Sequence, residues 1–163
     1  MKISKFTGLL ALCAFALSAQ IAVAGSCTLP ANGSALLAEA GPLVEAARRG
    51  AGASAISRNA VLDAVAQDHA CYVSRKGYSR TSPHRGAGGA TPKTRVKRAG
   101  YRSCLTAENM GLAQTSASQI VQSWMQSPGH RANITMRGMR EYGIGVALVD
   151  NKPVWVLVLA KPC

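Results

Sequence analysis

Acidic side chains and aromatic rings are both scarce in this chain. Only 7 residues are Asp or Glu, against 19 Lys or Arg, so the formal net charge is +12 at pH 7. Aromatic residues make up 5% of the sequence, and none lies between Arg80 and Gly100, where basic residues are dense. The charge favours an anionic partner, such as a lipid head group or a cell-envelope polymer. The shortage of stacking rings argues against specific recognition of nucleic acid.

Long apolar runs are also missing, except near the start. Gly8–Ile21 is almost entirely apolar, follows two lysines, and precedes Ala22–Ala24, whose small residues suit a signal peptidase. At about 14 residues, the run is shorter than the ~20 that a membrane-spanning helix needs. We expect residues 1–24 to be a cleaved signal peptide and residues 25–163 to form one secreted or periplasmic domain, monomeric and without a transmembrane segment. A lipoprotein anchor on Cys27 is the weaker alternative.

Cysteine is infrequent, but the predicted mature domain contains an even number. Of the five cysteines, Cys13 lies in the predicted signal peptide, and the others are Cys27, Cys71, Cys104 and Cys163. No two of these four are close in sequence, which favours two disulfides in an exported chain over a zinc site. Among the pairings that four cysteines allow, we expect Cys71–Cys104 and Cys27–Cys163.

Apolar periodicity predicts helices first and a β-hairpin last. Over residues 59–76 apolar side chains recur at three- and four-residue steps, and His69 lies on this stripe, which indicates a packed core histidine. Residues 142–149 and 153–160 predict the hairpin, and residues 154–159 are apolar throughout, as in a strand buried on both faces. Shorter helices are expected from residues 35, 92, 116 and 128, and a short strand at 108–113. This order predicts an α+β fold, a three-layer α/β/α sandwich around a small, mostly antiparallel sheet.

Three stretches follow one another in an order that is informative as a set. They are Ala107–Gly111 (AENMG), Trp124 with Ser127–Ile134 (SPGHRANI), and Glu141–Ala147 (EYGIGVA). They resemble the GEN strand, the W…SPGHRxNI signature and the (T/E)xxGxG strand of the CAP superfamily, the SCP-like group of cysteine-rich secretory, antigen 5 and pathogenesis-related proteins. With further matches at residues 66–70 and 98–101, the resemblance covers about residues 43–160.

The resemblance implies a cleft that holds two histidines and two glutamates. Three of these positions carry over directly, as Glu108, His130 and Glu141. The fourth falls on Arg80, which follows Tyr-Ser where family members have histidine. Arginine stays protonated and does not ligate metals as imidazole does. We therefore expect Arg80 to pair with Glu108 or Glu141, or else His84, four residues on, to reach into the cleft.

Two functional hypotheses follow. The first is a non-catalytic ligand-binding or interaction module of the cell envelope or extracellular space, which binds a lipid, a sterol or an anionic polymer. Its ligand cleft would consist of Arg80, His84, Glu108, His130 and Glu141. The alternative is a metal-assisted, protease-like hydrolase that uses Glu108, His130 and Glu141 in catalysis. A secreted ribonuclease with two catalytic histidines is a third idea, from composition alone. No cofactor is expected, the alternative being a divalent metal such as zinc on His130 with His84.

Overall fold

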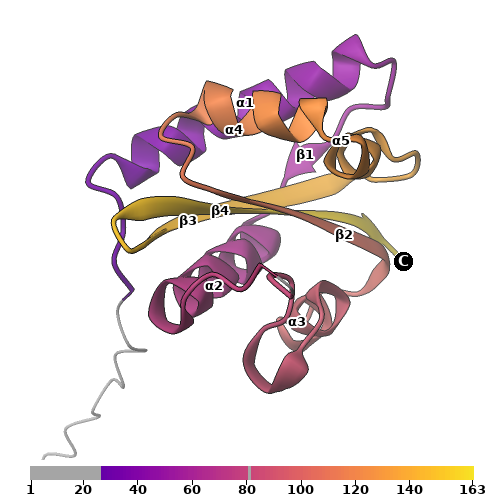
Figure 1. Cartoon of the computed structure of the whole chain (residues 1–163). Coiled ribbons are helices and arrows are strands. Elements are labelled where there is room, and N and C mark those ends of the chain that lie inside the picture. The colour runs from indigo at the N-terminus through magenta and orange to yellow at the C-terminus, as the bar shows by residue number, and fades with distance from the viewer. Residues whose placement is uncertain (1–26, 81) are drawn as a thin grey trace, which may run out of the picture.

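A four-stranded sheet separates the helices into two layers (Figure 1). The computed structural model describes residues 27–80 and 82–163, so the predicted signal peptide lies outside the described residues. Across the sheet the order is β1 (Ser57–Arg58), β3 (Glu141–Val149), β4 (Lys152–Pro162) and β2 (Ser103–Leu112). Only β1 and β3 pair in parallel. The predicted α+β sandwich with a mostly antiparallel sheet is confirmed.

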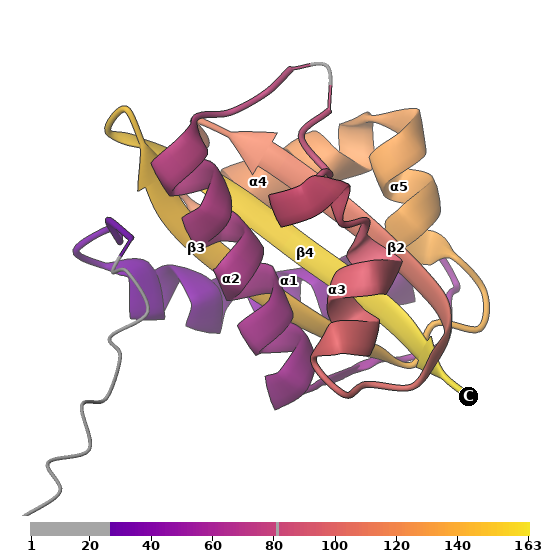
Figure 2. The same ribbon diagram turned by 90° about the horizontal axis from the view of Figure 1, so that it is seen from below.

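The two helical layers differ in their membership, and both views show the same division (Figures 1 and 2). The upper layer contains α1 (Gly33–Gly50), α4 (Ala117–Gln126) and α5 (Pro128–Thr135). The lower layer contains α2 (Ala60–Lys76) and α3 (Pro92–Arg98), with the short 3₁₀ turn η1 (Ala87–Gly89) in the loop between them. In the described part of the chain, none of the helices has the length and apolar composition to cross a bilayer.

Strand β4 connects the two cores because its side chains alternate between the layers. Trp155 and Leu157 pack with the upper helices, whereas Val156 and Val158 pack with the lower ones. All four side chains are fully buried, which explains why this segment is apolar at every position.

Helix α2 lies directly on β3 because two glycines of the EYGIGVA motif leave room for it. A Cβ on Gly143 would lie 2.0 Å from the carbonyl carbon of Leu62, and one on Gly145 would lie 2.5 Å from the backbone nitrogen of Gln67. The same helix satisfies the open edge of β3, since Gln67 bonds to both backbone polar groups of Val146, at 3.1 and 2.9 Å. An edge strand is thereby kept from pairing with another chain.

The predicted cysteine pairing was wrong, and the sheet register explains why. The structure joins Cys27 to Cys71, with Cα atoms 5.0 Å apart, and Cys104 to Cys163, with Cα atoms 4.8 Å apart. Strand β2 begins at Ser103, much earlier than the predicted start at residue 108, and pairs there with Pro162. Cys104 therefore lies beside the end of the chain rather than beside α2.

Candidate functional site

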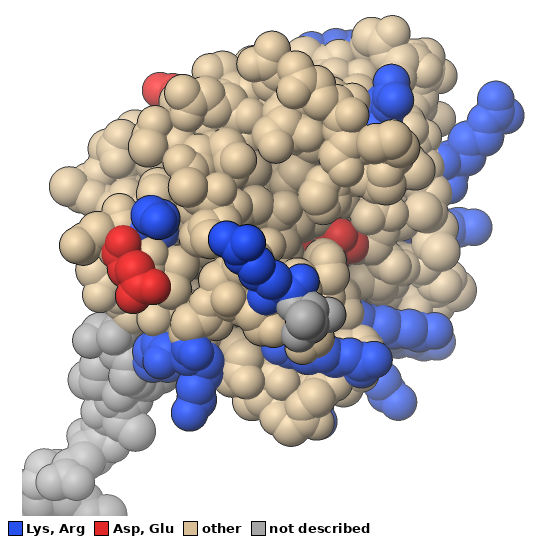
Figure 3. Space-filling model, in the orientation of Figure 1, with Lys and Arg blue, Asp and Glu red and all other residues tan. Residues whose placement is uncertain are grey.

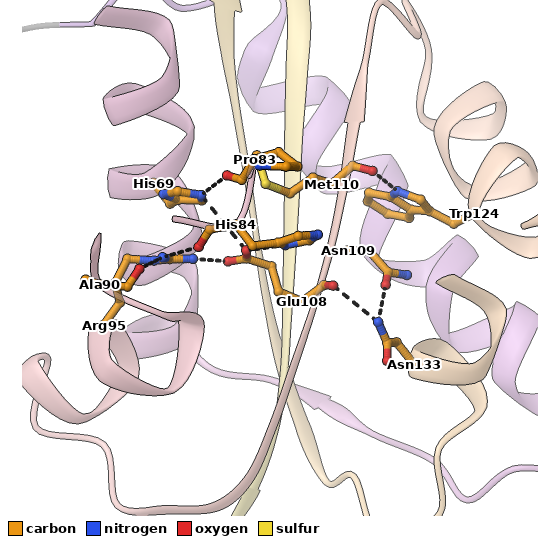
Figure 4. A network of polar contacts seen from close by, with 10 residues as sticks. All are labelled: His69, Pro83, His84, Ala90, Arg95, Glu108, Asn109, Met110, Trp124 and Asn133. Atoms are coloured by element: carbon orange, nitrogen blue, oxygen red, sulfur yellow. Dashed lines mark hydrogen bonds and ion pairs between the residues drawn. The ribbon is translucent and has the colours of Figure 1, made fainter. Parts of the chain in front are cut away.

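Glu108 is a buried carboxylate in the middle of β2. It lies opposite Val158, and because directly opposite residues of antiparallel strands share a face, its side chain points toward the lower layer. Only 1% of that side chain is exposed. Figure 4 shows Glu108 pointing toward α2 and α3, while its neighbour Asn109 points toward α5. The expectation that Glu108 opens a strand was wrong, since five residues of β2 precede it.

Both oxygens of this carboxylate are occupied by donors. Nδ1 of His84 donates to Oε1 at 2.8 Å, and the guanidinium of Arg95 donates to Oε2. Nε2 of His69 lies 3.9 Å from Oε1 (Figure 4). A buried charge is strongly unfavourable without a partner, so Arg95 and His84 are what allow a carboxylate at this position.

Arg95 also fixes the loop that carries His84. One of its guanidinium nitrogens donates to the carbonyl oxygens of His84 and Ala90, each at 2.9 Å. The helix that carries Arg95 is started by Thr91, whose hydroxyl accepts from the backbone N–H of Thr94 at 3.2 Å. Sequence reasoning missed Arg95 because it is one of several cations on a short basic helix, and only packing against β2 distinguishes it.

His69 lies below Glu108 and is fully buried in α2. Its Nε2–H donates to the carbonyl oxygen of Pro83 at 2.9 Å, which ties α2 to the loop before His84. Burial lowers the pKa of His69, and the nearby Arg95 lowers it further, against the opposing effect of Glu108. The structure thus places the expected core histidine beside the carboxylate as well, a proximity that its helical stripe did not indicate.

His84 and His130 face the same space from opposite layers. The bond from Nδ1 to Glu108 leaves Nε2 of His84 as the nitrogen open to a ligand, and 42% of this side chain is exposed. His130 lies in the first turn of α5 and is half-buried. Burial lowers its pKa, and the positive charge of His84 lowers it further, which indicates that the two imidazoles are close. Two partly exposed imidazoles, one oriented by a carboxylate, therefore border the open side of Glu108.

The remaining signature residues hold the upper helices against the open edge of β2. Asn109 donates to the carbonyl oxygen of His130 at 2.9 Å, and Asn133 donates to the amide oxygen of Asn109 at 2.9 Å (Figure 4). Trp124 donates from its indole N–H to the carbonyl oxygen of Met110 at 3.0 Å. These bonds place His130 relative to β2, and they give a physical role to three positions of the sequence signature.

Glu141 belongs to a separate network. It lies opposite Ala160, with β4 between it and Glu108. Its carboxylate accepts from Asn59 at 3.1 Å and from the hydroxyl of Tyr101. Burial and this bond raise the pKa of Tyr101. The structure brings Glu108, His84 and His130 together, whereas Glu141 is engaged elsewhere.

Arg80 is not the cation of the site. Its side chain is exposed, and among the described residues the ion pairs of Glu108 are with Arg95, His84 and His69. The expectation that Arg80 pairs with Glu108 or Glu141 was wrong. The loop of residues 77–91 instead places His84 against the carboxylate, the other arrangement that the sequence left open.

The donor set does not suit zinc. Among the described residues, no three His, Cys, Asp or Glu side chains are grouped as metal ligands. Both oxygens of Glu108 already accept bonds, and the guanidinium beside them would repel a dication. His84 and His130 alone would provide two ligands, fewer than the protein ligands of known zinc sites. The site is better described as a carboxylate neutralised from within the chain.

Comparison with known proteins places this arrangement in a family. Residues 43–159 match the model of CAP, the cysteine-rich secretory protein family. No curated protein matches the chain. Among solved structures, an outer surface protein from Borrelia burgdorferi is similar at 18% identity, with a TM-score of 0.65 and coverage of 74% of this chain and 87% of the other.

Two further structures show the same fold. An extracellular protein with an SCP domain from Bacillus anthracis is similar at 19% identity, with a TM-score of 0.68; the match covers 79% of this chain but only 41% of that one. NaASP2, solved with Zn²⁺, is similar at 13% identity and a TM-score of 0.50, with coverage of 82% and 88%. Such identities establish the fold alone. The family model, however, matches well over half of the sequence, and the chain belongs to the CAP family of cysteine-rich secretory proteins.

Proposed function

We propose that this protein is a non-catalytic binding module of the cell envelope or extracellular space, with its ligand held between His84 and His130. The observation that carries this proposal is the double engagement of Glu108, by His84 at one oxygen and by Arg95 at the other. A carboxylate occupied in this way is poorly placed to accept a proton from water or to ligate a metal.

The hydrolase alternative lacks further parts in the described residues. A histidine held by a carboxylate can act as a general base when a nucleophile lies within hydrogen-bond reach of its free nitrogen. No hydroxyl of a described residue bonds to the imidazole of His84 or His130, and the four cysteines outside the predicted signal peptide are in disulfides. The geometry therefore supports binding over turnover.

The chemistry of the surroundings supports the class of ligand. Two imidazoles with lowered or balanced charge can donate and accept hydrogen bonds without a strong preference for a charged group. The excess of basic residues favours an approach to anionic surfaces. A lipid, a sterol or an anionic envelope polymer fits these properties, and disulfides together with the expected signal peptide fit a secreted or periplasmic, monomeric protein.

The test compares the natural protein with His130→Ala in two assays. The first measures hydrolysis of casein and of nitrophenyl esters, with and without added zinc. The second follows the imidazole NMR signals of His84 and His130 while phosphatidylglycerol vesicles, with or without cholesterol, are added. His69 provides an internal control, because it is fully buried and should not report on ligands at the open side.

We expect no turnover that depends on His130 and a selective change in the His84 and His130 signals with one of the lipid mixtures. Turnover that disappears in His130→Ala would overturn the proposal. An unchanged pair of imidazole signals with every vesicle would remove lipid and sterol from the ligand class.

A further inference from the structure

A groove runs along the lower layer, between α2 and the segment of residues 79–99. It consists of three hollows that share walls, with volumes of about 320, 210 and 270 Å³. The first two share Tyr72 and Gly86, and the last two share Asp68, Arg95 and Arg98. We call this feature the α2–α3 groove. It lies apart from the open side of Glu108, where His84 and His130 meet.

Cations from three different elements line the groove. Lys76 comes from the end of α2, Arg85 from the loop, and Arg98 from the end of α3. All three side chains are exposed, and Asp68 is the acidic residue of the lining. Figure 3 shows Lys and Arg side chains gathered around the lower half of the molecule, over the layer of α2 and α3. The field in the groove therefore favours an anion.

The middle hollow contains two buried nitrogens without a partner. Arg95 and His69 both line it, and both Nε of Arg95 and Nδ1 of His69 are buried and lack a hydrogen bond. Buried polar atoms are seldom left unpaired, and such exceptions point to a missing ligand or water. An anion would satisfy Nε of Arg95 directly. It would also favour protonation of His69, which converts Nδ1 into a second donor, aided by Glu108 and opposed by Arg95 and His84.

The shape and lining of the groove select among anionic partners. Cations distributed along a furrow suit a chain that lies within it, whereas a membrane surface requires cations on a flat or convex face. Among the lining residues, Tyr72 is the aromatic ring, and it is half-buried and stacked on His69, with ring centroids 6.0 Å apart. Successive bases of a nucleic acid would therefore lack a stacking platform.

We propose that the α2–α3 groove binds a linear polyanion without aromatic bases, a polymer of phosphate-bearing units that contacts Lys76, Arg85 and Arg98 along its length. This inference goes beyond the proposed function, because it assigns a second binding surface that does not include His84 or His130. One anionic group of the polymer occupies the middle hollow, against Arg95 and His69.

The test uses fluorescently labelled long-chain inorganic polyphosphate as the probe. Its affinity is measured for the natural protein, for Lys76→Glu/Arg98→Glu, and for a matched control, Arg49→Glu/Arg137→Glu. The control changes the net charge equally, and its exposed residues lie at the end of α1 and just after α5, on the upper layer. Thermal unfolding of all three proteins verifies that they are folded.

We expect the groove variant to lose roughly tenfold or more in affinity, and its salt dependence to weaken by about one to two contacts. The control variant should lose less than about threefold, since only long-range attraction changes. The imidazole signals of His69 should shift when polyphosphate is added to the natural protein. This last result reports on the middle hollow and not on net charge.

Three outcomes would overturn the proposal. Equal losses in the two variants would assign the binding to net charge. Single-stranded DNA bound as tightly as polyphosphate would favour a nucleic-acid partner, and tighter binding of phosphatidylglycerol vesicles than of polyphosphate would favour a membrane. None of these outcomes depends on His130, so the failure of this inference is distinguishable from the failure of the proposed function.

Discussion

The two faces of the central sheet are packed by different kinds of side chain. The upper core contains both tryptophans, together with Tyr142, Ile120 and several Leu and Ile residues. The lower core consists mainly of Val and Ala, and α2 meets β3 through glycines. The buried ion pair of Glu108 and the α2–α3 groove both lie on the lower side.

This difference indicates a division of labour. The upper layer is a densely packed support, and its polar bonds, such as those from Asn133 and from the buried Arg48, link the helices to backbone carbonyls. The lower layer positions charges and leaves hollows between α2, α3 and their loop. Mutations in the first layer should therefore change stability, and those in the second should change binding or pH response.

The largest expected effect is on the upper side. Trp124→Ala removes a fully buried ring and its bond to Met110, and it should lower the free energy of unfolding by about 4 kcal/mol. Chemical denaturation measures this loss. Polyphosphate affinity of the folded protein should stay unchanged, and a comparable loss of affinity would contradict the division between the layers.

A smaller effect is expected where α2 sits on the sheet. In Gly143→Ala the new Cβ would lie 2.0 Å from a backbone carbon of α2, so the helix must move, at a cost of about 3 kcal/mol. Gly50→Ala is the matched control, because no atom lies within 4 Å of its added Cβ. Denaturation curves that are equal for the two variants would show that the close contact is not required.

The next effect tests charge balance at the site. Arg95→Met leaves the buried carboxylate of Glu108 without its cation and should cost about 2 kcal/mol. The double variant Arg95→Met/Glu108→Gln has no unpaired charge and should regain part of that stability. If the double variant is less stable than the single one, charge neutralisation is not what Arg95 provides.

The smallest effect is a dependence on pH. Burial lowers the pKa of His69 in the folded chain, whereas the unfolded chain takes up a proton near the ordinary value of about 6.5. Stability should therefore decrease as the pH falls below about 6.5, by at most about 1.4 kcal/mol per pH unit for this group, until the lowered pKa is reached.

His69→Gln provides the comparison for this pH effect, since glutamine can donate to Pro83 but does not titrate. Its free energy of unfolding, measured between pH 7 and pH 5, should decline less steeply than that of the natural protein. An identical slope would assign the acid sensitivity to another group, of which His130, whose pKa is also lowered by burial, is the first candidate.

Much of the fold followed from local patterns. The helical stripe of residues 59–76 and the uniformly apolar run of residues 154–159 correspond to α2 and the buried part of β4. The hairpin turn is one residue shorter than expected, because Asp150 and Asn151 adopt positive φ values of 49° and 60° and close it as a two-residue turn.

The site was less accessible to sequence reasoning, for physical reasons. The signature placed Glu108 and His130 near the open edge of β2, but it could not show that β4 separates Glu141 from them. The role of Arg95 depends on how α3 rotates against β2, and Cys104 found Cys163 because β2 starts earlier than its apolar pattern indicated. Each miss concerns a tertiary contact between segments whose own patterns were interpreted correctly.

The most direct test of the account concerns the claim that Glu108 is neutralised by Arg95 and His84 rather than by a metal. Zinc is titrated into the natural protein by calorimetry, with the His84 and His130 signals followed by NMR in parallel. The account predicts no stoichiometric heat and no coordinated shift of the two imidazoles. Tight one-to-one binding that is lost in His130→Ala would contradict it.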